Sequence, residues 1–294
     1  MITPYSNIIS VTTLGTNLLL DTYTGAAAAY SLRKLRSGYT GSAIRVRRAV
    51  GSPSETDIGF VNNELDIATL ESFCSGTDGF VQTWYDQSDN VSPKNATQTT
   101  AANQPQIVSS GSVILENGKP AIFFNNPTGI GTQWLNTGTQ LSLFNVGSIY
   151  SVASFINSGN FRAIFSNGYD ASAGIWVGSV SGLIPKLQLW TSNVNTQGGN
   201  NSFSFNTQVL QSYFFETAVA NGHKIYVNNT LDVQETKTFR INTPLTNGAI
   251  GRDASSNDYP MHGFEQELLF FPEKTNTNNS GINSNINTFY GIYV

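Results

Sequence analysis

The stretch GFVQTWYDQ, residues 79–87, mixes β-branched and aromatic residues with polar ones and leads into the polar sequence SDN. This composition predicts a β-strand followed by a loop. Similar runs recur from here to residue 272. Turn-forming residues separate them at intervals of roughly 8 to 15 residues. The pattern predicts an all-β protein.

Two of these runs carry hairpin signals. In ENGKPAI, Asn117 and Gly118 lie between two β-rich runs, and Asn-Gly is typical of a two-residue hairpin turn. A second hairpin is predicted in GHKIYVNNTLDVQET, with its turn around Asn228 and Asn229. Short strands joined by such turns favour a single β-sandwich with small helical additions.

The sequence TGAAAAYSLRKLRSGYTG has a helical pattern. Ala26–Ala29, Leu32 and Leu35 follow helical spacing, with Thr24 as N-cap and Gly38 as stop. We therefore predict a first short helix here. The following SAIRVRRAV predicts a strand.

Two further helices are predicted. From Glu64 to Phe73, apolar residues fall on one side of a helix. The tail TNTNNSGINSNINTFYGIYV predicts a last helix that ends near Tyr290.

Length and composition limit the class of protein. Of the 294 residues, 39% are apolar and only 12% are charged, which is about half the usual charged share. The 18 Phe, 12 Tyr and 4 Trp can bury far more area than a disordered chain does. The sequence shows neither a repeat nor an interdomain linker. We predict an N-terminal arm, residues 1–20, and one sandwich domain, residues 21–294.

Charge and cysteine content exclude other classes. A net charge of −4 gives no electrostatic footprint for nucleic acid. For the basic cluster Arg45, Arg47 and Arg48 we favour local salt bridges over a phosphate site. Cys74 is the single cysteine, which excludes an intrachain disulfide and a cysteine-based metal site.

The sequence predicts no signal peptide and no membrane span. It begins without the basic and apolar regions of a secretory signal. No run approaches the roughly 18 apolar residues that a spanning helix needs. We expect a protein that reaches the outside of a cell by a route other than ordinary secretion.

The motif WYDQS, residues 84–88, allows two interpretations. Its aromatics, carboxylate and amide could handle a sugar. Alternatively, Trp84 and Tyr85 alternate faces of a strand, so that one is in the core, while Asp86, Gln87 and Ser88 bond the loop that follows. We favour the structural interpretation.

Three stretches together resemble a known family. They are residues 18–48 (LLLDTYTGAAAAYSLRKLRSGYTGSAIRVRR), residues 65–74 with 81–88 (LDIATLESFC and VQTWYDQS), and residues 248–272 (GAIGRDASSNDYPMHGFEQELLFFP). They resemble the catalytic domain of the α-L-arabinofuranosidase B family, glycoside hydrolase family 54. Similar segments occur in proteins of Bacteroidetes bacteria and their phages, often in virion or tail proteins. The resemblance implies a concanavalin-like or laminin-G-like jelly-roll β-sandwich with two or three short helices.

The resemblance also implies where catalytic residues would lie. A retaining glycosidase needs two carboxyl groups about 5 to 5.5 Å apart. Asp253 falls on the family's acid position. The family's nucleophile is a Glu on a middle strand, but Gly159–Tyr213 contains no Glu, and its only carboxylate is Asp170. Glu216 lies on a later strand. The paired cysteines that the family places against the sugar are also missing.

We therefore expect a hydrolase fold without the family's hydrolase site. The alternative is an active arabinofuranosidase-like hydrolase with Asp253 as acid and an unrecognised nucleophile such as Asp170. A structural role for Asp253 is open too, because an Asp in a turn commonly accepts backbone N–H bonds or coordinates a cation.

If the fold binds sugar, exposed aromatics with amides and carboxylates are the expected contacts. Two tryptophans lie on middle strands, and the other candidates lie on loops that could reach them. The predicted carbohydrate-binding residues are Trp176, Trp190, Tyr169, Asp170, Asp253, Asn257 and Tyr259.

Other chemistry has little support in the sequence. His223 and His262 are the only histidines, and neither has the spacing of a zinc site. We predict no cofactor and no catalytic metal. A structural Ca²⁺ in the turns SNGYDASAG or RDASSND stays an open alternative.

The sequence thus predicts a structural protein of a phage virion, on a spike, tail fibre or capsid surface, that attaches to host-cell glycan without catalysis. Cell lysis would release it, which removes the need for a signal peptide. The arm would contact other virion proteins, and copies of the sandwich would form a homo-oligomer, for example a trimer.

Overall fold

A computed structural model describes residues 18–52, 54–138, 146–156, 161–167, 174–180, 182–189, 194–198, 201–239, 248–254, 258–273 and 276–294. Within these ranges the helices are α1 (Leu19–Thr22), α2 (Ile67–Phe73), η1 (Ala101–Asn103), η2 (Asn276–Asn278) and α3 (Asn279–Tyr290). The strands are β1 (Ala28–Ser31), β2 (Ile44–Arg48), β3 (Glu55–Ile58), β4 (Phe60–Val61), β5 (Glu64–Leu65), β6 (Gly79–Trp84), β7 (Ala96–Thr97), β8 (Gln106–Ser109), β9 (Ser112–Val113), β10 (Leu115–Glu116), β11 (Lys119–Pro120), β12 (Ile122–Phe124), β13 (Leu135–Gly138), β14 (Val146–Phe155), β15 (Phe161–Ser166), β16 (Ile175–Val180), β17 (Ile184–Leu189), β18 (Val194–Gln197), β19 (Val209–Glu216), β20 (His223–Val227), β21 (Thr230–Glu235), β22 (Gly248–Ile250) and β23 (Gly263–Phe271).

β23 is the central strand of the first sheet. One of its edges pairs with β14, and its other edge pairs with β1 and β12 one after the other. β14 continues to β19, which leads to the β20–β21 hairpin. These pairings are all antiparallel, so the all-β prediction is confirmed.

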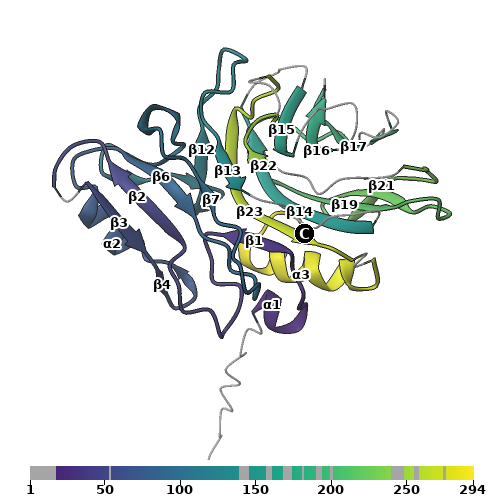
Figure 1. Cartoon of the computed structure of the whole chain (residues 1–294), viewed down its shortest axis with the longest axis horizontal. Coiled ribbons are helices and arrows are strands. Elements are labelled where there is room, and N and C mark those ends of the chain that lie inside the picture. The colour runs from purple at the N-terminus through teal and green to yellow at the C-terminus, as the bar shows by residue number, and fades with distance from the viewer. Residues whose placement is uncertain are drawn as a thin grey trace, which may run out of the picture.

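A second sheet has the order β13, β22, β15, β16, β17 and β18. Figure 1 shows β15, β16 and β17 at the upper right, above β14 and β19. A third group, with β2, β3 and β6, lies at the left and joins the sheets through β7 and β8. The result is a jelly-roll sandwich with short helices.

The main core fills the space between the two sheets. Phe165 of β15 and Phe270 of β23 meet there, with ring centroids 4.7 Å apart. Trp84 at the end of β6 belongs to the same buried cluster. Aromatic contacts between layers fix their spacing, because each ring buries a large area in one geometry.

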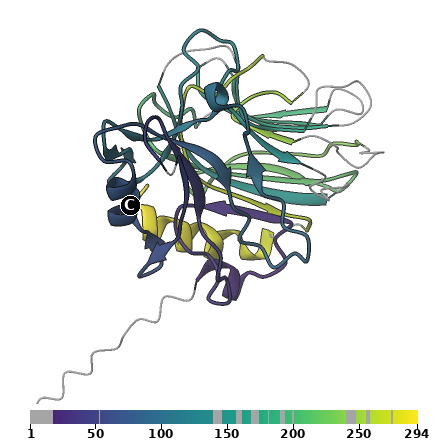
Figure 2. The same cartoon turned by 60° about the vertical axis from the view of Figure 1, so that its left-hand side comes forward.

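A second apolar cluster covers the other face of the first sheet. Tyr150 of β14 and Leu269 of β23 point to this face and pack against Ile282 and Ile286 of α3. In both views α3 lies alongside β1, on the side away from β15 and β16 (Figures 1 and 2). The first sheet is therefore buried on both faces.

This double burial explains one wrong prediction. The Ala-rich segment expected to form a helix from Ala26 onward is the strand β1, paired with β23. Ala28 lies in the main core and Ala29 in the α3 cluster. A strand with two apolar faces lacks the alternation that marks a half-buried strand, and tertiary pairing overrides the helix propensity of alanine.

The predictions of the two other helices and of the two hairpin turns agree more closely with the structure. The C-terminal helix ends at Tyr290, as predicted, and Gly291 is its left-handed C-cap. α2 begins at Ile67 and ends at Phe73, so the helix predicted from Glu64 is shorter, because Glu64–Leu65 form β5. Both hairpin turns are confirmed: Asn117 and Gly118 join β10 to β11, and Asn228–Asn229 join β20 to β21.

The end of the predicted arm is part of the folded body. Leu19 and Leu20 in α1 are buried in the α3 cluster. Residues 1–17 lie outside the described ranges. In the part of the chain that is described, no helix is both long and apolar enough to cross a membrane.

Candidate functional site near Asp253

Asp253 lies in the connection between β22 and β23, and its side chain is fully buried. Its backbone N–H donates to the carbonyl of Asp258 at 3.2 Å, which closes a turn. Ser166 Oγ, at the end of β15, donates to Asp253 Oδ2 at 3.1 Å. The acid that the family resemblance singled out is thus bonded into its own turn and to the neighbouring strand.

Backbone and side-chain bonds hold the same connection onto β15. The N–H of Ala163 donates to the carbonyl of Tyr259 at 2.8 Å. Arg162 is buried and donates to the carbonyl of Pro260 at 3.1 Å. Burial lowers the pKa of the Arg162 guanidinium. These contacts fix the position of Tyr259, whose φ of 53° is in the left-handed region.

Two aromatic rings lie together at this end of the sandwich. Tyr259 and Phe161, the first residue of β15, have ring centroids 5.0 Å apart. Phe161 is 36% exposed, and the ammonium of Lys186 lies 5.2 Å from its ring centroid. Partial burial lowers the pKa of Lys186. Phe161 was not among the predicted residues, because nothing in its short run of sequence distinguishes an exposed aromatic residue from a buried one.

Trp176 on β16 is 2% exposed and contacts Phe161 edge to face, with centroids 6.4 Å apart. It belongs to a small apolar cluster with Ala163 and Val180. Among the described residues, its indole N–H has no hydrogen-bond acceptor. Trp176 therefore supports the exposed ring of Phe161 from behind.

The remaining predicted binding residues, Tyr169, Asp170, Trp190 and Asn257, lie outside the described ranges. So do residues 168–173 and 255–257 of the two turns considered for Ca²⁺. These assignments stay predictions. Within the described ranges, no group of three His, Cys, Asp or Glu side chains is close enough to hold a metal ion.

Asp258, in the same connection as Asp253, is exposed. The described parts of β15, β16 and β17 contain neither Asp nor Glu. Glu216 lies at the far end of β19, opposite Val146. Glu265 of β23 points into the main core, fully buried, and burial raises its pKa well above the usual value. Such an environment favours the neutral, protonated form of the carboxyl group.

The two histidines are core residues. His223 Nδ1 lies 2.8 Å from Thr196 Oγ1, and burial, with a smaller effect of Lys237, lowers its pKa to about 4. His262 packs against the ring of Phe123, with centroids 5.8 Å apart, and burial lowers its pKa.

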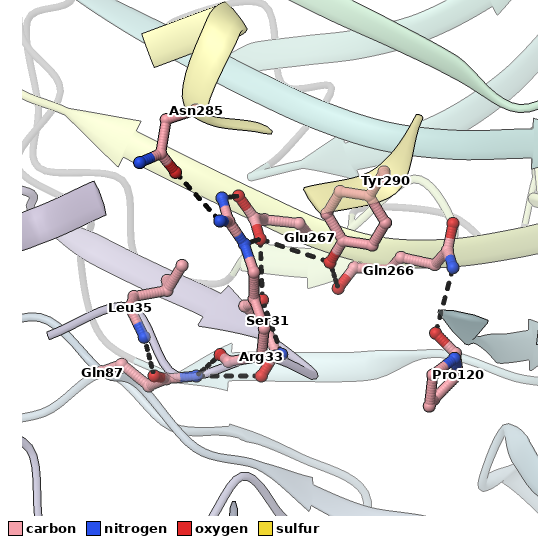
Figure 3. A network of polar contacts seen from close by, with 9 residues as sticks. All are labelled: Ser31, Arg33, Leu35, Gln87, Pro120, Gln266, Glu267, Asn285 and Tyr290. Atoms are coloured by element: carbon pink, nitrogen blue, oxygen red, sulfur yellow. Dashed lines mark hydrogen bonds and ion pairs between the residues drawn. The ribbon is translucent and has the colours of Figure 1, made fainter. Parts of the chain in front are cut away.

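Other sequence motifs have structural roles. Trp84 is in the core, and buried Asp86 accepts bonds from the backbone N–H groups of Ala29, Ser88 and Lys94 at 2.8–2.9 Å. Asp86 therefore anchors both the loop, as predicted, and β1. Gln87 accepts from Leu35 N–H at 2.9 Å and donates to the carbonyls of Ser31, at the end of β1, and of Arg33 (Figure 3).

The local salt bridges predicted for Arg45, Arg47 and Arg48 are present for Arg45, whereas Arg47 and Arg48 donate to neutral groups instead. Arg45 pairs with Glu55 at 3.1 Å and with Asp57 at 3.2 Å. Arg47 donates to the side chain of Gln104 at 2.7 Å. Both arginines are thus engaged by neighbours on adjoining segments.

The fold of this chain is similar to that of known proteins. Neither a protein-family model nor a curated protein matches the chain. A GH54 α-L-arabinofuranosidase soaked with a cyclic sulfate inhibitor matches with a TM-score of 0.65 and 16% identity, over 96% of this chain and 66% of that one. An arabinofuranosidase complexed with arabinofuranosyl-α-1,2-xylobiose matches with a TM-score of 0.64 and 18% identity, over 93% of this chain and 64% of that one. The chain thus spans just under two thirds of these proteins, and at such identities the likeness shows that it has the β-sandwich fold of the GH54 enzymes.

Proposed function

We propose that this protein attaches to host-cell glycan from the surface of a phage virion, without hydrolysing it. The observation that carries the proposal is the burial and hydrogen bonding of Asp253. In a GH54-like fold it is the acid at the family's position, yet it is fully buried and bonded to Ser166 and to its own turn. A general acid must reach the glycosidic oxygen of a bound sugar.

The described strands beside Asp253 support the same proposal, since β15, β16 and β17 supply no second carboxylate. They supply instead the exposed ring of Phe161, with Tyr259 beside it. Sugar C–H groups pack on such rings, and Lys186 adds a donor for hydroxyl groups. This arrangement favours holding a sugar over cleaving it.

The virion assignment rests on the sequence. The resemblance to phage-encoded virion and tail proteins and the uncharged segment 1–17 support it. In this proposal the segment contacts other virion proteins, and the assembled protein is a homo-oligomer. The oligomeric state can be tested by measuring the mass of the full chain in solution. A monomer at all concentrations would contradict the proposed homo-oligomer.

Binding and hydrolysis can be tested on the same preparation. We expect the full chain to bind at least one glycan on an array of bacterial surface polysaccharides. We also expect no release of nitrophenol from 4-nitrophenyl α-L-arabinofuranoside. Turnover that Asp253→Asn abolishes would establish the hydrolase alternative and refute the proposal.

Two variants locate the binding surface. Phe161→Ala and Tyr259→Asn each remove a ring, and Asn tolerates the left-handed backbone at position 259. We expect each to weaken glycan binding by about fivefold to tenfold. Leu115→Ala is the matched control, because Leu115 is 49% exposed on β10, distant in the fold from β15. Equal loss in all three variants would contradict this location.

A further inference from the structure

A recess lies beside α3, on the face of the first sheet opposite to β15 and β16 (Figure 1). Its volume is about 500 Å³, within the range of small-molecule sites. We call it the α3 pocket. It is lined by Leu18, Arg33, Lys34, Asn62, Asn63, Glu64, Ser284, Asn285, Thr288 and Phe289.

The floor of the α3 pocket includes the guanidinium group of Arg33, which a buried ion pair holds in place (Figure 3). Arg33 Nε and Nη2 donate to the two carboxylate oxygens of Glu267 at 2.7 and 2.9 Å. Arg33 Nη1 donates to Asn285 Oδ1 of α3 at 2.9 Å, and the guanidinium carbon lies 5.0 Å from the ring centroid of Phe289. A bidentate pair with a third bond holds the floor in one geometry before any ligand arrives.

One wall is the tight turn between β4 and β5. Asn62 and Asn63 have φ values of 52° and 66°, and the Lys34 N–H donates to the Asn63 carbonyl at 2.9 Å. The side-chain amides of both asparagines are exposed and make no hydrogen bond to any described residue. Ser284 and Thr288 of α3 lie on the other side. The Thr288 hydroxyl donates to the Ser284 carbonyl at 2.7 Å, so its oxygen is available to a ligand as an acceptor. The walls therefore offer several donors and acceptors that can bind hydroxyl groups.

The charges around the α3 pocket leave one cation uncompensated. Glu267 neutralises Arg33, and Lys119 neutralises Glu64 at 3.0 Å. Lys34 has no carboxylate within ion-pair distance among the described residues. A ligand that complements this lining carries one negative charge and several hydroxyl groups.

We infer that the α3 pocket binds an acidic sugar residue, a hexuronic or a sialic acid, with its carboxylate at Lys34 and its hydroxyl groups at the amides of Asn62 and Asn63. The surface at Phe161 is lined chiefly by aromatic rings, whereas this one adds a lysine and several amide and hydroxyl groups to its apolar lining. The two sites lie on opposite sides of the first sheet. A variant can therefore lose binding at one site and keep it at the other.

Calorimetric titration of the full chain tests the inference. The probes are glucuronic acid and N-acetylneuraminic acid, with glucose as the neutral sugar and acetate as the carboxylate without hydroxyl groups. We expect saturable binding of at least one acidic sugar and none of glucose or acetate at the same concentrations. Binding of neither acidic sugar, or equal binding of glucose or acetate, would overturn the inference.

Variants decide where an acidic sugar binds. Lys34→Gln keeps length and polarity but removes the charge, and we expect about fivefold weaker binding. Asn63→Gly keeps the left-handed backbone and removes the amide, with a smaller loss expected. Lys224→Gln on β20 is the charge-matched control and should bind normally. Unchanged affinity in Lys34→Gln, or loss in Phe161→Ala instead, would assign the binding elsewhere and overturn the inference. Thermal unfolding of each variant confirms that it is folded.

Discussion

Arg33 and Glu267 form an ion pair 2.7 Å long that joins the segment after β1 to the middle of β23, and both side chains are almost fully buried, at 7% and 1% exposure. Ser31 Oγ and Tyr290 Oη also donate to Glu267 Oε2, at 2.8 and 3.3 Å. The carboxylate thus connects β1, β23 and α3 (Figure 3). Removing one partner leaves a buried charge without compensation.

We therefore predict that Glu267→Gln lowers the free energy of unfolding by about 3–5 kcal/mol. The double variant Arg33→Met/Glu267→Met should be less destabilised than Glu267→Gln, because it leaves no buried charge behind. Urea unfolding followed by tryptophan fluorescence measures both. A loss below about 1 kcal/mol for Glu267→Gln would place the pair among ordinary surface salt bridges and contradict the burial described here.

Asp86 should be a second point of high sensitivity. It accepts from three backbone N–H groups and from Ser88 Oγ at 2.9 Å, so Asp86→Ala leaves several buried donors unpaired. We expect a loss of at least about 3 kcal/mol in the free energy of unfolding. The control is Asp89→Ala, because Asp89 is exposed three residues away, and its loss should stay within about 0.5 kcal/mol. Similar unfolding curves for both variants would show that Asp86 is not an anchor.

These two anchors show what the sequence can and cannot predict. The turns at Asn117–Gly118 and Asn228–Asn229 depend on the conformational preferences of neighbouring residues, so local sequence predicts them. Arg33 and Glu267 are 234 residues apart, and nothing local to either indicates the other. The α3 pocket was not predicted for the same reason, since its lining comes from distant segments.

The site near Asp253 was predicted in part. Its position came from a family resemblance, and Tyr259 was identified with it. That Asp253 is buried depends on Ser166 and on a turn closed by Asp258, which only the folded chain brings together. β1 could not be recognised as a strand from its sequence. Pairing with β23 buries both of its faces, so its apolar residues do not alternate with polar ones as in a half-buried strand.

His223 provides a test of core packing by pH. Its pKa in the folded chain is about 4, mainly because of burial, against about 6.5 in an unfolded chain. The stability that the neutral ring contributes is therefore complete above pH 6.5 and is lost as the pH falls toward 4. NMR titration of the ring C–H signals should show a midpoint near 4. A midpoint near 6.5 would mean that the ring is solvated.

Glu265 should have the opposite pH dependence. Burial raises its pKa in the folded chain well above the usual value, while Ser151 Oγ, 2.9 Å from Oε1, opposes the shift by a smaller amount. Below about pH 4.3 the carboxyl group is protonated in both the folded and the unfolded chain. As the pH rises further, only the unfolded chain ionises, so the folded chain loses stability until the pH reaches its own raised pKa.

The matched variant Glu265→Gln isolates this effect, because glutamine is neutral at every pH and nearly the same size. Above about pH 4.3, the free energy of unfolding of the native chain relative to Glu265→Gln should fall as the pH rises, by at most about 1.4 kcal/mol per pH unit. Urea unfolding of both proteins at pH 5, 6 and 7 measures the slope. Parallel pH profiles would mean that Glu265 ionises as readily in the folded chain as in the unfolded one, which a carboxyl group buried between two sheets cannot do.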